Sequence, residues 1–162
     1  MIKIEPLTSN RLEETINLLN TVFPNDTDDP AGCLRASLNP EKYAPFFLKT
    51  QIPELRYWVA INNLGKVVGT TGLYCYKSDR EEAFWLGWFS VEPEARNKGI
   101  GTQLLQFSIE KAKGERKKFL RLYTSTDFKD AIRLYEKHGV GLTKEEPYPD
   151  TELKKLYYEL KF

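Results

Sequence analysis

The stretch FSVEPEARNKGIGTQLL, residues 89–105, passes from a β pattern to a helical pattern through one short loop. A run rich in aromatic and β-branched residues ends at Val91, and Pro93 closes it. An apolar period of about 3.6 residues then begins near Gly99 or Ile100. The sequence therefore predicts a strand, a glycine-containing turn and a helix in direct succession.

This turn has the composition of an anion site. The first N–H groups of a helix have no partner within the helix, and the helix dipole places partial positive charge there. Gly99 and Gly101 allow close approach of the backbone to a ligand, while Arg96 and Lys98 add positive charge. Because a pyrophosphate needs several converging donors, we expect the turn to favour such an anion.

A plain strand-to-helix connection, in which the glycines only form the turn, explains the same residues. Two other phosphate-binding patterns are absent, since the sequence contains neither GxGxxG nor GxxxxGK[ST]. A nucleotide-binding domain of another kind remains an alternative, and it would bind ATP.

The periodicity along the chain gives a β-α-α-β-β-β-α-β-α-β-β order. Strand patterns are expected at residues 2–5, 57–61, 66–76, 83–91, 119–124, 140–143 and 153–160. Helices are expected from Asn10 to Phe23, from Asp29-Pro30 onward, from Ile100 to about Gly114, and over residues 131–138. Three prolines favour an irregular segment over residues 39–56. The order predicts one α+β (mixed α/β) domain over residues 1–162, with a mostly antiparallel sheet of about six to seven strands and about four flanking helices.

Composition restricts the class of partner. The net charge of +1 gives no reason to expect nucleic acid or a membrane surface, and no apolar run or signal pattern is present, so we expect a cytoplasmic protein. Cys33 and Cys75 lack CxxC spacing, so neither a metal site nor a disulfide framework is expected. Residues 1–55 hold five Lys/Arg against eight Asp/Glu, and residues 96–137 hold eleven against five. The second segment can favour an anionic ligand and the first a cationic one, although solvated helix faces explain the same charges.

Two motifs resemble those of a known family. Residues 89–105 are similar to the acetyl-CoA-binding motif of the GNAT superfamily of acetyltransferases, whose Q/R-x-x-G-x-G/A core is matched by Arg96, Gly99 and Gly101. Residues 131–140, AIRLYEKHGV, resemble the A-x-x-L-Y-E-K-x-G-F motif of the same superfamily. The two motifs follow one another in the family's order, which is far more specific than either alone.

The resemblance implies acetyl-CoA as co-substrate. Backbone N–H groups of the turn would hold its pyrophosphate, and backbone groups at the end of the preceding strand would pair with its pantetheine arm. The implied cofactor-binding residues are Phe89, Val91, Arg96, Asn97, Lys98, Gly99, Ile100, Gly101 and Thr102. A backbone N–H near Phe89 would also stabilise charge on the thioester oxygen.

The resemblance also implies an N-acetyltransferase that moves acetyl from acetyl-CoA to a primary amine by direct attack. The family's tyrosine corresponds to Tyr135, which would protonate the leaving thiolate as general acid. A second interpretation of Tyr135 is a core aromatic residue on the helix stripe that contains Ala131, Leu134 and His138. The acceptor stays open, as does the choice between monomer and homodimer.

Two positions depart from the family pattern. The glutamate that often acts as base corresponds to Trp85, and only Glu81 and Glu82 stand nearby. Phe128 occupies the position of an asparagine that often contacts the cofactor. These departures leave open an alternative function, a non-catalytic acyl-CoA-binding sensor or docking module.

Two groups of residues give weaker indications of the binding site for the acceptor amine. Asp26, Asp28 and Asp29 lie in the region that shapes the acceptor site in this family, where they can select a cationic amine, although turn formation and capping explain them as well. The aromatic residues near Trp85 and Trp88 are either plain core or part of a cleft for an apolar or aromatic substrate.

Overall fold

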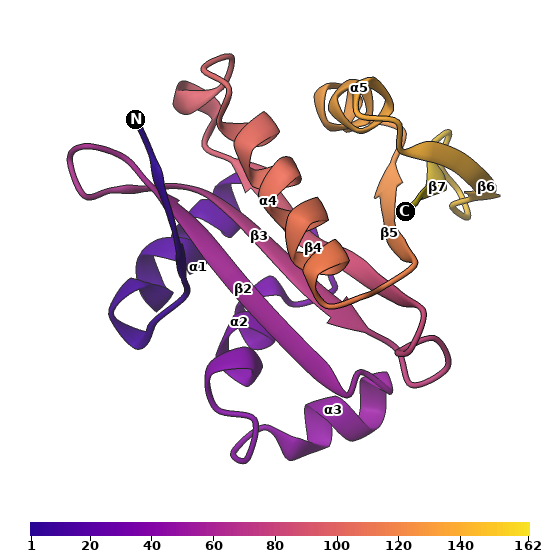
Figure 1. The fold of residues 1–162 in the computed structure, drawn as a ribbon, viewed down its shortest axis with the longest axis horizontal. Coiled ribbons are helices and arrows are strands. Elements are labelled where there is room, and N and C mark those ends of the chain that lie inside the picture. The colour runs from indigo at the N-terminus through magenta and orange to yellow at the C-terminus, as the bar shows by residue number, and fades with distance from the viewer.

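The computed structural model describes residues 1–162, which contain one seven-stranded sheet. Figure 1 shows how the strands and helices are arranged. The strands are β1 (Lys3–Pro6), β2 (Glu54–Ile61), β3 (Val67–Cys75), β4 (Ala83–Val91), β5 (Phe119–Ser125), β6 (Gly141–Pro147) and β7 (Lys154–Lys161). Their order in the sheet is β1-β2-β3-β4-β5-β7-β6. Every neighbouring pair is antiparallel except β4 and β5, so the predicted mixed α/β fold with a mostly antiparallel sheet is confirmed.

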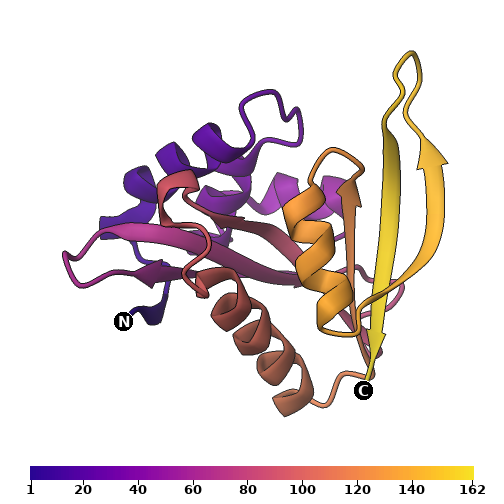
Figure 2. The ribbon, with the colours of Figure 1, turned by 90° about the horizontal axis from the view of Figure 1, so that it is seen from above.

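Helices cover both faces of this sheet (Figure 2). The α-helices are α1 (Leu12–Val22), α2 (Pro30–Leu38), α3 (Ala44–Thr50), α4 (Ile100–Gly114) and α5 (Lys129–Lys137), and short 3-10 helices span Ser9–Arg11 and Pro93–Ala95. Side chains of α1, α2 and α3 pack with one buried cluster, and those of α4 and α5 pack with another. None of these helices combines the length and the hydropathy of a membrane-spanning segment.

The segment 39–56 was expected to be irregular, and this expectation is wrong for its central part. Helix α3 occupies residues 44–50, which makes five α-helices rather than about four, and β2 begins directly after Pro53. Pro45 lies in the first turn of α3, where a missing N–H costs nothing because that position has no intrahelical acceptor. A proline therefore marks the start of this helix instead of breaking it.

Leu104 illustrates how tightly α4 is seated on the sheet. Its side chain is fully buried, and a Cβ added to Gly69 on β3 would stand 2.8 Å from its Cδ1 atom. We expect Leu104→Ala to lower the free energy of unfolding by about 2–5 kcal/mol, because it removes buried methyl groups and leaves a cavity. Urea denaturation measures this, with the exposed Leu64→Ala as control. A loss of unfolding free energy as small as that of the control would contradict the close packing of Leu104 on the sheet.

The strands β4 and β5 diverge, and this positions the site. They pair only at Ala83–Phe119, Phe84–Leu120 and Trp85–Arg121, and beyond Trp85 no pairing connects them (Figure 1). Within β4, Trp88 and Phe89 together lie opposite Thr71 of β3, and Trp88 has a φ of 42°. Such a bulge bends a strand. The carboxyl-terminal half of β4 therefore leaves β5 and opens the sheet.

Candidate active site

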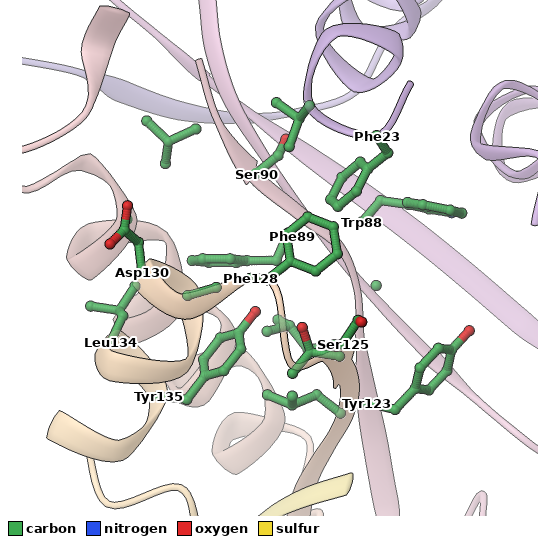
Figure 3. A pocket seen from close by; sticks show the side chains of 18 of the residues that line it. Phe23, Trp88, Phe89, Ser90, Tyr123, Ser125, Phe128, Asp130, Leu134 and Tyr135 are labelled. Carbon is green, nitrogen blue, oxygen red and sulfur yellow. The ribbon is translucent and has the colours of Figure 1, made fainter. Parts of the chain in front are cut away.

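A cavity of about 880 Å³ occupies this opening. It is lined by the turn after β4, the first residues of α4, one side of α5, the end of β5 and, beyond them, residues of α1, α2 and α3. Figure 3 shows side chains from the end of α1, from β4, from β5 and from α5 around a common space. The cavity thus joins the predicted phosphate turn to the acidic loop between α1 and α2.

The turn between β4 and α4 presents unpaired donors. No backbone N–H from Asn97 to Thr102 donates to another group of the protein, and the first paired amide of α4 is that of Gln103, which donates to the Gly99 carbonyl at 3.1 Å. Gly99 has a φ of 82°, a backbone conformation that is strained for any residue with a side chain. The buried side chain of Ile100 fixes the start of the helix against the core. The geometry is that of an anion-binding helix start.

The free edge of β4 faces the opening. The Glu92 N–H donates to the Val68 carbonyl at 2.8 Å, so by the alternation of an antiparallel pair the backbone groups of Val91 point away from β3. Arg96 Nε donates to the Val91 carbonyl at 3.0 Å, which ties the turn to the strand end. Backbone groups on this edge can therefore pair with an extended ligand, as a neighbouring strand would.

The predicted cofactor-binding residues are brought together with one exception. The cavity is lined by Phe89, Val91, Arg96, Asn97, Gly99, Ile100, Gly101 and Thr102. Lys98 instead lines a smaller hollow beside Met1 and Leu64, so the structure does not bring its side chain into this cavity. Its backbone N–H remains one of the unpaired donors of the turn.

Tyr135 lies on α5 with its side chain directed toward the cavity (Figure 3). The residue is only 4% exposed, and its ring packs 5.7 Å from that of Phe89 and 6.3 Å from that of Tyr158. Burial raises the pKa of the Tyr135 hydroxyl well above its ordinary value, and no hydrogen bond to the protein engages this hydroxyl. Tyr135 is thus both part of the core, as the stripe indicated, and a protonated donor in the cavity.

Phe128, at the position where the family often has an asparagine, packs against other rings of the protein. Phe128, which precedes α5, makes an edge-to-face contact with Phe23 at 5.4 Å, and Phe23 makes another with Trp88 at 5.3 Å. These three rings connect the start of α5 to β4 by way of the end of α1 (Figure 3). The sequence indicated Phe23 only as a helix-stripe residue, and no local pattern pairs it with Phe128.

The acids considered as bases lie outside the cavity. Trp85 Nε1 donates to Asp79 Oδ2 at 2.8 Å, and Arg121 pairs with the same oxygen at 3.0 Å and with Glu82 at 3.2 Å. Neither Glu81 nor Glu82 lines the cavity. The carboxylates that line it are Asp26, Asp28, Asp127 and Asp130. Asp29 instead caps α2, where its carboxylate accepts from the Gly32 N–H at 3.0 Å.

The surroundings of the two cysteine thiols and of His138 do not indicate a catalytic role. Burial raises the pKa of Cys75 and of Cys33 to about 11, so both are protonated at neutral pH. His138 Nδ1 lies 2.9 Å from the Leu134 carbonyl at the end of α5, in agreement with a helix-end role. No group of three or more His, Cys, Asp or Glu residues is arranged to hold a metal ion.

Two buried hydroxyl groups in the cavity were not predicted from the sequence to belong to the site. The Oγ atoms of Ser90 and Ser125 are buried, and neither has a hydrogen-bond partner in the protein. Both residues line the cavity (Figure 3). A buried polar atom without a partner is unusual, so these hydroxyls are available to a ligand.

Comparison with protein families matches residues 13–140 to the Acetyltransferase (GNAT) family. The Bacillus subtilis protein YdhI is 35% identical over 86 residues, which are 53% of this chain and 50% of YdhI. The chain thus matches about half the length of that relative.

Solved structures share the fold along almost the whole chain. A GNAT-family acetyltransferase from Staphylococcus aureus Mu50 is similar with a TM-score of 0.73 and 24% identity, covering 99% of both chains. NAA60 from Arabidopsis thaliana, in complex with acetyl-CoA, is similar with a TM-score of 0.76 and 13% identity, covering 99% of this chain and 98% of its own. At these identities the likeness concerns the fold.

Proposed function

The chain belongs to the acetyltransferase (GNAT) family, and on this premise we propose that it is an N-acetyltransferase with one domain over residues 1–162. It transfers the acetyl group of acetyl-CoA to a primary amine by direct attack. The observation that carries this proposal is the single cavity that joins unpaired N–H groups of a helix start to the unengaged hydroxyl of Tyr135.

In this proposal the pyrophosphate of acetyl-CoA binds the N–H groups from Asn97 to Thr102, with added charge from Arg96, while Lys98 contributes only its backbone N–H. The pantetheine arm lies along the free edge of β4, between Phe89 and Val91, in the opening left by β5. Charge-assisted hydrogen bonds to a helix start suit a phosphate group, and the splayed strand provides the donors and acceptors that an amide-containing arm needs.

The chemical step then forms a C–N bond and breaks a C–S bond. The neutral amine attacks the thioester carbon, and the N–H near Phe89 stabilises the developing oxyanion. As the intermediate collapses, Tyr135 donates its proton to the sulfur, so that CoA leaves as a thiol. The attacking nitrogen loses its proton to water on the acceptor side, and Tyr135 is reprotonated from water.

A specific observation favours a second candidate, the acyl-CoA-binding module. Trp85 occupies the position where a base is common and donates a hydrogen bond to Asp79, and Phe128 occupies the position of the asparagine and packs on Phe23. Titration with acetyl-CoA, followed by a screen of amines for CoA release, distinguishes the two. Release of CoA together with an acetylated amine supports the enzyme. Tight binding without release for any acceptor supports the module.

The pH profile follows from the protonation of two groups, because the reaction needs a protonated Tyr135 hydroxyl and a neutral amine. The raised pKa of Tyr135 keeps its hydroxyl protonated to above about pH 10, the ordinary value for tyrosine. An alkylamine with a pKa of about 10 becomes more reactive as pH rises. We therefore expect kcat/KM to rise steadily from about pH 6 to pH 9.5. A falling limb near neutral pH would contradict Tyr135 as the acid.

A further inference from the structure

The cavity has a second part on the face of the sheet covered by α1, α2 and α3, and we call this part the acceptor chamber. Its wall is aromatic and consists mainly of Phe46, Tyr57, Tyr76, Trp88, Tyr123 and Tyr148. These residues come from α3, from three strands, and from the β3–β4 and β6–β7 connections. The aromatic wall of the chamber is therefore formed by several separate elements, and it is not the apolar face of a single helix.

Two glycines allow rings to cover the floor of the chamber. A Cβ on Gly72 of β3 would collide with the ring of Tyr57 on β2, and one on Gly87 of β4 would stand 3.1 Å from the ring of Tyr74. The rings of Tyr57 and Tyr74 thus each lie over a glycine of the neighbouring strand, where no side chain occupies the space. These two rings give the chamber an apolar floor, and each ring carries a hydroxyl group.

Two hydroxyl groups in this part of the cavity differ in their hydrogen bonding. Tyr57 is only 5% exposed and lines the cavity, and its hydroxyl has the Cys33 thiol as a weak hydrogen-bond partner. Ser90 is 3% exposed and lines the same cavity, and its Oγ has no hydrogen-bond partner in the protein. Because a buried polar group without a partner is costly, the Ser90 hydroxyl points to a ligand that enters this space.

The charged residues that line the cavity come from two regions. The basic residues Arg96, Lys129, Arg133 and Lys137 come from the phosphate turn and from α5, and Asp127 and Asp130 line the cavity at the start of α5. The chamber side carries Asp26 and Asp28 of the α1–α2 loop. After burial, the charge of Asp28 is the next cause that raises the pKa of Tyr123, and Asp26 contributes as well. Both carboxylates thus lie near the hydroxyl of a chamber wall.

On the basis of the proposed function, we infer that the acceptor is an arylalkylamine, a small amine whose ring binds the aromatic chamber and whose ammonium group Asp26 and Asp28 attract. Aromatic rings pair favourably edge to face or offset, and the chamber offers several ring faces and edges. The amine is cationic at neutral pH, so the two carboxylates concentrate it at the chamber and repel carboxylate-bearing analogues.

Matched acceptors test this inference. The full-length protein is assayed with acetyl-CoA and either 2-phenylethylamine, phenylalanine or ethanolamine. Phenylalanine keeps the ring and amine but adds a carboxylate, whereas ethanolamine keeps the amine and lacks the ring. We expect kcat/KM for 2-phenylethylamine to exceed both others by about 30-fold or more, which is about 2 kcal/mol.

Variants test the two carboxylates. Replacing Asp26 and Asp28 together by asparagine is expected to raise KM for 2-phenylethylamine about tenfold and to narrow the discrimination against phenylalanine. Asp29→Asn is the matched control, because it removes one charge from the same loop outside the cavity while asparagine caps a helix equally well. Equal effects of the control and the double variant would overturn the inference.

Calorimetric binding of 2-phenylethylamine to the CoA-bound protein separates this inference from the proposed function. If no amine is acetylated, but 2-phenylethylamine binds and the double variant loses that binding, the chamber's ligand class stands and the enzyme assignment fails. If a lysine peptide or an amino sugar is acetylated with a higher kcat/KM than every arylalkylamine tested, the enzyme assignment stands and this inference fails.

Discussion

Replacing Tyr135 by phenylalanine is expected to lower kcat by about 10²-fold or more while the affinity for acetyl-CoA stays unchanged. The reason is the position of the hydroxyl, which lies at the cavity, bonds to nothing in the protein and stays protonated because burial raises its pKa. Its loss removes the proton donor for the thiolate and leaves the ring packed on Phe89. Steady-state kinetics and acetyl-CoA titration of the same preparation measure both effects.

Tyr158→Phe is the matched control for this substitution. Tyr158 is also buried and packs on Tyr135, but its hydroxyl donates to Glu136 at 3.0 Å and does not line the cavity. We expect this control to keep kcat within about twofold, since it removes a hydroxyl without touching the reacting atoms. A Tyr135→Phe enzyme with the kcat of the control would show that another group protonates the thiolate.

Gly99→Val is expected to weaken acetyl-CoA binding by about 100-fold, the second large effect. Gly99 lines the cavity with a φ of 82°, and no atom stands within 4 Å of an added Cβ. A valine there occupies the open space in front of the unpaired N–H groups and strains the turn. Losing two charge-assisted hydrogen bonds of about 1.5 kcal/mol each accounts for a change of this size.

Gly65→Val separates this loss of ligand contacts from simple backbone strain. Gly65 has a φ of 77° and equally open surroundings, but it lies in the β2–β3 turn outside the cavity. The two variants should lose similar stability in thermal unfolding, whereas only Gly99→Val should lose acetyl-CoA affinity by calorimetry. If both variants bind acetyl-CoA like the parent protein, the turn is a plain connection.

The phosphate turn was predictable because its features are local. A strand end, a positive-φ glycine and the unpaired amides of a helix start all lie within residues 89–105, so sequence pattern and backbone physics suffice. The period of α5 likewise placed Tyr135 on a buried stripe, and the structure shows that the stripe borders the cavity. The catalytic and binding roles of these residues remain predictions that the variants test.

The contacts that the sequence did not indicate join distant segments. Phe128 meets Phe23, and Trp85 meets Asp79 and through it Arg121 of the next strand. Each of these residues fits its own local pattern, as a helix-stripe, strand or turn residue. Only the assembled sheet decides which of them face one another.

The acceptor chamber was foreseen only in part for the same reason. The sequence left open whether Asp26 and Asp28 form a turn or select a cation, and the structure shows that both also line the cavity. The Asp28 N–H donates to Asp26 Oδ1 at 2.8 Å, so turn formation holds as well. Tyr57 reaches the chamber because Gly72 on the neighbouring strand leaves room for its ring, and strand register determines that pairing.

A crystal structure of the protein with CoA tests the central claim most directly, namely that one cavity brings the phosphate turn and Tyr135 to the same ligand. The account predicts pyrophosphate oxygens within hydrogen-bonding distance of the N–H groups of residues 97–102, the pantetheine arm along β4, and the sulfur beside the Tyr135 hydroxyl. CoA bound away from the turn, or a sulfur remote from Tyr135, would contradict it.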